Sequence, residues 1–190
     1  MVKPSSFYPN PDSAVLLVVD IQERLAASMP DEPLKRTLRS AGVLINGCKV
    51  LNIPILVTEQ YTRGLGTTVG EIREALGDVT PIEKMAFSCY GEPAFRQALG
   101  ALGDAGSNVI LCGIECHVCV LQTALDLLEN GHSVYVAVDA VCSRAKLNWQ
   151  TGLELMRQAG AVIGTTEIFL FQMLKEAGTE RFKQISRLVR

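Results

Sequence analysis

A cysteine that follows a glycine-containing turn has the most chemically suggestive setting in this chain of 190 residues. Cys119 comes after an apolar run that ends at Gly113, and it lies in the first turn of a helix predicted over 118–129. Free N–H groups and the helix dipole at such a position favour a thiolate, lower the thiol pKa and can hold a developing oxyanion. The alternative is a small buried apolar side chain, and position alone does not decide between the two.

A nucleophilic thiol needs a group that takes its proton, and neither histidine is well placed for this. His117 is too close to Cys119 along a tight turn, and His132 lies at a predicted helix end. Asp20 directly follows an apolar run, so its carboxylate cannot point unpaired into the core. It is the best candidate base, with a helix N-cap as the other interpretation. Lys84 ends a short predicted strand; it is an ordinary surface lysine unless it faces the same cleft, where it would stabilise negative charge.

The chain has six cysteines, which raises the question of a metal site. The spacing of Cys112, Cys116 and Cys119 matches the pattern that holds an iron–sulfur cluster in radical enzymes that cleave S-adenosylmethionine. Cys112, however, lies within a predicted buried strand, whereas the other two follow the turn. No second Cys/His pair has zinc-ligand spacing. We therefore expect no metal and no cofactor.

The elements that position these residues alternate between strands and helices. Continuous apolar runs predict buried strands over 14–19, 53–58, 108–113, 133–138 and 161–164, with one further short strand over 81–84. Helical spacing predicts helices over 34–51, 93–102, 118–129, 148–159, 166–176 and 180–188. Such alternation predicts a parallel sheet between two helical layers, a three-layer α/β/α fold. Ligands of such sheets bind beyond the carboxyl ends of the strands, where Asp20, Lys84 and Cys119 are expected.

Composition sets the broad class of protein. Hydrophobic residues make up 48% of the chain and the formal net charge is -2, which gives no electrostatic reason to expect nucleic acid or an anionic membrane as a partner. No apolar run is long enough to span a bilayer, and residues 1–11 lack the apolar stretch of a signal peptide. We predict one cytoplasmic domain over 1–190, with its core at about 14–171.

Three segments resemble the isochorismatase-like cysteine hydrolase family, and the resemblance extends over about 14–171. The segments are 17–22, the Glu83–Lys84 pair ahead of Phe87, and 113–120. Residues 58–61 together with 64–66 are similar to the subgroup called isochorismatase domain-containing proteins.

The resemblance implies a Rossmann-like fold with a six-stranded, mainly parallel sheet. It also implies a triad of Cys119 as nucleophile, Asp20 as base and Lys84 as electrostatic partner. A cis peptide at Ile114–Glu115 would aim the backbone N–H groups of Glu115 and Cys119 at the carbonyl oxygen of the substrate. The reaction so implied is attack of the thiolate on an amide carbonyl, loss of amine, and hydrolysis of the thioester.

Two departures from the family pattern shape the functional prediction. Nicotinamidases of this family bind a metal through an Asp-x-His pair and a later His, whereas residues 59–62 here hold no histidine. Cys116 stands where the family usually has Thr, and it is either a redox partner of Cys119 or a packed side chain.

We predict a metal-independent cysteine hydrolase of a small amide or related C–N bond. Its alternative is a catalytically silent small-molecule-binding or scaffold protein that keeps the fold. The apolar segment 168–171 suggests the interface of a homo-oligomer, a dimer or a tetramer, although a core helix would show the same pattern. The residues predicted to contact the substrate are Gln22, Gln60, Tyr61 and Phe87.

Overall fold

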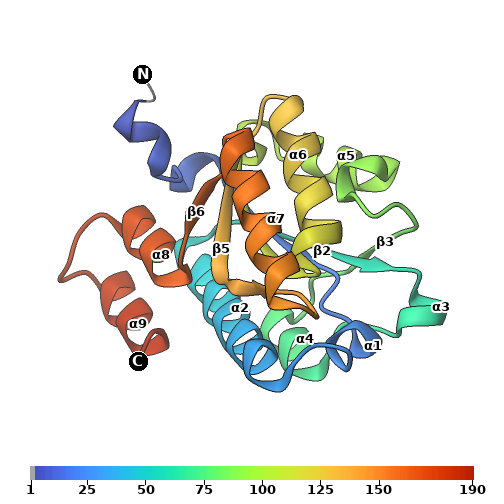
Figure 1. Cartoon of the computed structure of the whole chain (residues 1–190). Helices are drawn as coiled ribbons and strands as arrows, with labels where there is room; N and C mark the ends of the chain where they lie inside the picture. Colours follow the sequence, from blue (N-terminus) through green and yellow to red (C-terminus); the bar gives the residue numbers. More distant parts are fainter. Residues whose placement is uncertain (1–2) are drawn as a thin grey trace.

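The computed structural model describes residues 3–190 and contains a single six-stranded sheet with helices on both faces (Figure 1). The strands are β1 (Ala14–Val19), β2 (Ile55–Gln60), β3 (Ile82–Lys84), β4 (Asn108–Ile114), β5 (Ser133–Cys142) and β6 (Val162–Gly164). Their order is β3-β2-β1-β4-β5-β6, and every neighbouring pair is parallel. This confirms the predicted fold class.

The chain moves outward from β1 in two directions, which places a topological switch point between β1 and β4. The strands up to β3 form one wing of the sheet, and the strands from β4 onward form the other. In parallel α/β sheets, the crevice beside such a switch point is the usual ligand site.

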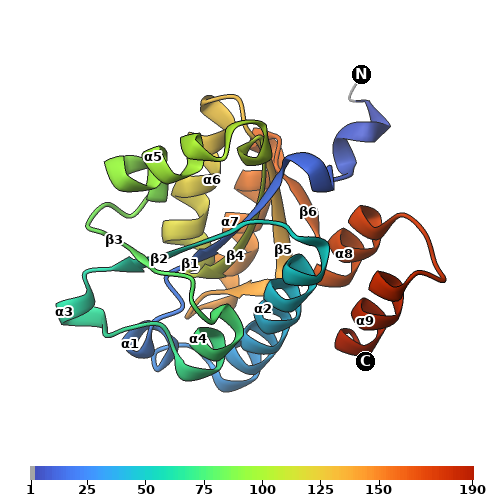
Figure 2. The ribbon, with the colours of Figure 1, turned by 180° about the vertical axis from the view of Figure 1, so that it is seen from behind.

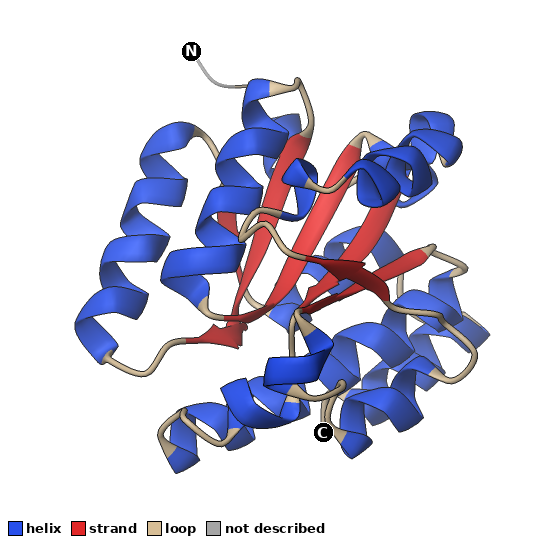
Figure 3. Cartoon of the chain, turned by 90° about the vertical axis from the view of Figure 1, so that its right-hand side faces the viewer, coloured by secondary structure: helices blue, strands red, loops and turns tan. Residues whose placement is uncertain are grey.

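The helices divide between the two faces of the sheet. Helices α5, α6 and α7 cover the face turned toward the viewer in Figure 1, and α2, α4, α8 and α9 cover the face seen in Figure 2. Figure 3 shows the strands between the two helical layers. The helices are α1 (Glu23–Ala26), α2 (Asp31–Leu51), α3 (Thr62–Leu65), α4 (Gly70–Leu76), α5 (Pro93–Ala101), α6 (Leu121–Glu129), α7 (Lys146–Ala159), α8 (Thr166–Leu174) and α9 (Glu180–Leu188).

The apolar strand residues are buried on both faces because each strand supplies two cores. In β1, Leu16 and Val18 pack with the α2 layer, whereas Val15 and Leu17 pack with the α6 layer. All six residues of β1 are buried. Successive side chains of a strand point to opposite faces of the sheet, and here both faces are covered. This explains why the strand sequences are continuously apolar.

Several predicted boundaries were wrong; the strand predicted over 53–58, for example, is observed at Ile55–Gln60, and two differences concern the segments near the site. Strand β5 was expected to stop before Asp139 but continues to Cys142, with a register irregularity against β4. Asp139 is tolerated there because its Oδ1 accepts hydrogen bonds from Thr166 N at 2.8 Å and Thr166 Oγ1 at 3.1 Å. The helix predicted over 118–129 is replaced by a π-helical turn, η5 (Cys116–Val120), followed by α6.

Among the helices within residues 3–190, none combines the length and apolar character that crossing a bilayer requires.

Candidate active site

Three side chains from the ends of three strands converge beside the switch point. Asp20 directly follows β1, Lys84 ends β3, and Cys119 lies in η5 after β4. Lys84 reaches across β2, and its Nζ lies 2.7 Å from Asp20 Oδ2, with both side chains fully buried. Lys84 therefore faces the same site as Asp20 and is not a surface lysine.

The ammonium group of Lys84 is engaged by protein oxygens. Besides the Asp20 carboxylate, Nζ donates hydrogen bonds to the carbonyl oxygens of Ala86 and Phe87, both at 3.0 Å. Two of the three N–H groups of the ammonium are therefore hydrogen-bonded to carbonyl oxygens, and its charge is paired with the Asp20 carboxylate. Burial is the largest influence and would lower the pKa of Lys84, but the charge of Asp20, together with smaller contributions from Cys89 and Cys119, brings the pKa above its ordinary value. Lys84 thus supplies positive charge to the site, while two of its donors are already bound by carbonyl oxygens.

The other oxygen of Asp20 is held by a residue that sequence reasoning missed. Thr58 Oγ1, in β2, donates to Asp20 Oδ1 at 2.7 Å. The Thr58 hydroxyl has a single proton, so in its 3.5 Å contact with Cys89 Sγ the thiol is the donor. Burial, followed by the charge of Asp20, raises the pKa of Cys89 to about 11, so this thiol keeps its proton at neutral pH. The only signal for Thr58 in the sequence is a hydroxyl that ends an apolar run.

Cys119 is an almost buried thiol whose proton points at a neutral acceptor. Cys119 is 4% exposed, and its Sγ donates a hydrogen bond to Gln60 Oε1 at 3.2 Å. Burial is the main cause that raises its pKa; the charge of Asp20 adds to the effect, while Lys84 opposes it. The expectation of a thiolate stabilised by a helix start was therefore wrong. The resting residue is a thiol because desolvation and a neighbouring carboxylate outweigh the cation.

The turn that carries Cys119 is closely fitted to β1. Gly113 has φ 130°, and a Cβ added there would lie 2.0 Å from the carbonyl oxygen of Val19. The Ile114–Glu115 peptide bond is cis. The carboxylate of Glu115 accepts hydrogen bonds from the backbone N of Arg144 at 3.0 Å and from its Nε at 3.1 Å. The turn is therefore fixed on both sides, at β1 and at the loop after β5.

The predicted substrate contacts separate into two kinds. The Gln22 side chain is buried: its Oε1 accepts from Gln60 N at 2.7 Å, and its Nε2 donates to Gln60 O at 3.0 Å and Gly66 O at 2.7 Å. Its polar atoms are thus used in holding the segment after β2. Gln60 touches the thiol, whereas Tyr61 and Phe87, which are 47% and 53% exposed, follow β2 and β3 at the carboxyl edge of the sheet.

Cys112 and Cys116, the other two cysteines of the iron–sulfur spacing, do not form a cluster with Cys119. Cys112 packs in the core beneath α2, whereas Cys116 and Cys119 belong to the core on the opposite face of the sheet. This separation contradicts the three-cysteine iron–sulfur arrangement. Cys116 Sγ lies 3.8 Å from the carbonyl oxygen of Trp149 and so packs toward α7. Within residues 3–190, no group of three or more His, Cys, Asp or Glu side chains is arranged to hold a metal ion.

His117 is occupied away from the thiol. Its Nε2 lies 3.3 Å from Asn148 Nδ2, and its Nδ1 lies 3.0 Å from Ser143 Oγ. Because an amide nitrogen can only donate, Nε2 is the acceptor and Nδ1 carries the proton. Both ring nitrogens therefore serve the contact with the loop before α7 and with α7 itself.

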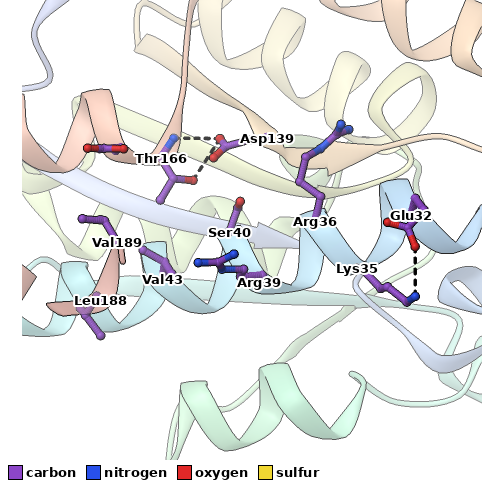
Figure 4. Close-up of a pocket in the computed structure, with 11 residues that line it drawn as sticks. Glu32, Lys35, Arg36, Arg39, Ser40, Val43, Asp139, Thr166, Leu188 and Val189 are labelled. Atoms are coloured by element: carbon purple, nitrogen blue, oxygen red, sulfur yellow. Dashed lines mark hydrogen bonds and ion pairs between the residues drawn. The ribbon is translucent and has the colours of Figure 1, made fainter. Parts of the chain in front are cut away.

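A charged pocket lies elsewhere on the molecule, between α2, α8 and α9 (Figure 4). It has a volume of about 480 Å³ and is lined by charges of both signs, among them Arg36, Arg39 and Asp139. Its lining does not include Asp20, Lys84 or Cys119, so it is separate from the site that these three residues form.

The Isochorismatase domain family model matches residues 14–168, most of the chain. The chain belongs to the isochorismatase family. Relatives include the secreted isochorismatase effector Isc1 of Phytophthora sojae, 40% identical over 183 residues that cover 95% of this chain and 86% of that protein. Isochorismatase domain-containing protein 2A of Mus musculus is 37% identical over 180 residues, which cover 95% of this chain and 84% of the mouse protein.

A solved structure shares the fold of this isochorismatase-family chain closely. The MAR1 ribonuclease from Caenorhabditis elegans superposes with a TM-score of 0.87 at 38% sequence identity, covering 96% of this chain and 92% of that one. The predicted family and its isochorismatase domain-containing subgroup are thus confirmed.

Proposed function

We propose that this protein is a metal-independent cysteine hydrolase that cleaves a small amide or related C–N bond through a thioester on Cys119. One observation carries the proposal. A thiol, a carboxylate and an ammonium from three strand ends share one buried site, in which the charges of Asp20 and Lys84 act on Cys119. Perturbed, desolvated groups of this kind are typical of catalytic sites.

The high pKa of Cys119 decides how the first step would run. A preformed thiolate is disfavoured, so the proton passes from Sγ to the Asp20 carboxylate as sulfur attacks the carbonyl carbon. Lys84 offsets the negative charge that the pair carries. The backbone N–H groups of Glu115 and Cys119 are the proposed donors to the oxyanion.

The later steps return each proton. Protonated Asp20 gives its proton to the departing nitrogen, the amine leaves, and Cys119 is left as a thioester. Asp20 then takes a proton from water as the water oxygen attacks the thioester carbonyl. As this intermediate collapses, the carbon–sulfur bond breaks and sulfur takes the proton back from Asp20, which yields a carboxylic acid, the free thiol and the Asp20 carboxylate.

An acylation screen tests the proposal. The protein is incubated with a panel of small carboxamides, ureas and carbamates, and its intact mass is followed while the modified peptide is located. We expect an acyl adduct on Cys119 that Cys119→Ala lacks and that Asp20→Asn forms much more slowly. Cys116→Ala is the matched control, because this thiol is in the same turn but packs toward α7. Full turnover by Cys119→Ala would refute the mechanism.

Two other functions are outcomes of the same screen. A panel with neither turnover nor adduct favours the small-molecule-binding or scaffold alternative. Cleavage of RNA that depends on Cys119 would instead favour the activity named for the worm relative. The net charge of -2 does not favour a polyanionic substrate.

Cytoplasmic location and assembly into a dimer or tetramer stay predictions. Light scattering on the purified protein tests the second of these.

A further inference from the structure

The acceptor that faces the nucleophile is held by an unusually fixed backbone. Gln60 Oε1 accepts from Cys119 Sγ at 3.2 Å. The backbone N and O of Gln60 are both bonded to the buried side chain of Gln22, at 2.7 Å and 3.0 Å. Only the Gln60 side chain is therefore free to adjust, and its carboxamide is presented to the sulfur atom.

The proposed reaction takes the donor away from this acceptor. Once the proton of Cys119 passes to Asp20, sulfur can no longer donate, and the lone pairs of a thiolate face those of Oε1. Gln60 is only partly buried, so water can serve Oε1 in the free protein; once a bound substrate displaces that water, an acceptor without a donor is costly. A new donor is needed at the moment when the substrate is bound.

The neighbouring side chains cannot provide that donor. Two N–H groups of Lys84 are bound by carbonyl oxygens and its charge is paired with Asp20, and the Thr58 proton is given to Asp20. Both amide hydrogens of Gln22 have acceptors as well, on Gln60 and Gly66. Among these fixed groups, each donor is already committed, so the incoming molecule is the remaining source.

We propose that Gln60 Oε1 selects substrates whose scissile carbonyl carries an N–H group, namely primary or secondary amides, ureas and carbamates of the NH type. The nitrogen is bonded to the carbon that sulfur attacks, so it must lie beside Sγ, where Oε1 stands. Esters and tertiary amides have no proton to offer and leave the acceptor unpaired. This inference rests on the proposed function, with Cys119 as nucleophile.

A pair of chromogenic probes tests the selection without knowledge of the natural substrate. The probes are p-nitrophenyl N-methylcarbamate and p-nitrophenyl N,N-dimethylcarbamate. In each, Cys119 attacks the carbonyl carbon, the carbon–oxygen bond to the phenol breaks, p-nitrophenolate leaves, and an S-carbamoyl group remains on sulfur. The intact mass confirms one adduct per chain, and the rates at neutral pH give a selectivity ratio.

We expect the wild-type ratio of NH probe to dimethyl probe to exceed that of Gln60→Leu by at least about tenfold. Dividing the two ratios removes the intrinsic reactivities of the probes. Gln60→Glu keeps an acceptor and should keep the selectivity, although its negative charge slows both reactions. Gln60→Met replaces Gln60→Leu if the latter does not fold, as judged by its thermal transition.

The outcomes separate this inference from the proposed function. Equal ratios in wild type and Gln60→Leu, with both adducts lost in Cys119→Ala, overturn the role of Gln60 alone. Adducts that persist in Cys119→Ala, or their absence from the wild type, overturn the nucleophile and the selection together.

Discussion

Replacing Thr58 with valine isolates one hydrogen bond behind the proposed base. Valine has nearly the same shape as threonine but puts a methyl group where Oγ1 donates to Asp20 Oδ1 at 2.7 Å. Both residues are fully buried, so water cannot replace the lost donor. The Cys89 thiol loses its acceptor at the same time.

The size of the effect follows from the charge of the acceptor. A hydrogen bond to a charged group contributes about 1.5–3 kcal/mol, roughly twice that of a neutral pair. We therefore expect the free energy of unfolding of Thr58→Val to fall by about 2 kcal/mol. For a domain of this size, that corresponds to a decrease in Tm of roughly 4–8 °C. Thr58→Ser keeps the hydroxyl and should lose only about 1 kcal/mol, for the missing methyl group.

Two measurements on the same variants check this reasoning. Urea unfolding gives the stability, and peptide mass spectrometry gives the rate at which iodoacetamide alkylates Cys119. We expect alkylation of Thr58→Val to be about tenfold slower than wild type, because the base is no longer oriented. Thr37→Val is the matched control, since Thr37 is equally buried but lies on α2 outside the site. If Thr58→Val loses no more stability than Thr37→Val, the hydrogen bond does not hold Asp20 as described.

Three further changes probe the ion pair, the turn and the buried thiols. Lys84→Met should destabilise the fold by about 3–5 kcal/mol in urea unfolding, because Asp20 is left charged and unpaired; a smaller loss would mean that the ion pair is not needed. Gly113→Ala should lower the free energy of unfolding by on the order of 3 kcal/mol, since its Cβ would meet the backbone of Val19. Gly100→Ala in α5 has open space around the added Cβ and should be neutral or stabilising. Equal effects of the two changes on Tm would contradict this contrast. Burial raises the pKa of Cys48 from 9.0 to about 12, so the unfolded chain loses this proton before the folded one. The contribution of this thiol to the free energy of unfolding is therefore fully present below pH 9 and should decline between pH 9 and about 12, by about 1.4 kcal/mol per pH unit. Urea unfolding of Cys48→Ala should show a shallower decline over the same range.

Most of the fold could be predicted from the sequence because its strands are continuous apolar runs. β1 was placed at its observed bounds for this reason. The end of β5 could not be predicted, since Asp139 was expected to break the strand. Its carboxylate caps α8 instead, through a contact with Thr166 that is distant in the chain.

The site was predictable only where a polar side chain interrupts an apolar run or follows a distinctive turn. Asp20 and Cys119 satisfy that condition, and Lys84 needed the family resemblance. Thr58 and Cys89 remained hidden because a buried hydroxyl and a buried thiol resemble ordinary core residues until their partners are seen. The direction of the Cys119 pKa also escaped prediction, because the depth of burial and the nearness of Asp20 are tertiary properties.

The division of the sheet into two wings sets the order in which the parts of the site can form during synthesis. Asp20, Thr58 and Lys84 belong to the first wing, so their ion pair and hydrogen bonds require only the part of the chain made first. Cys119 comes later and meets the carboxylate only when β4 pairs with β1. Because synthesis proceeds from the N-terminus, the nascent chain contains the proposed base, Asp20, with its partners before the proposed nucleophile, Cys119, has been made. Modification of Cys119 that depends on Asp20 would then report that the two wings have joined through the long-range pairing of β4 with β1.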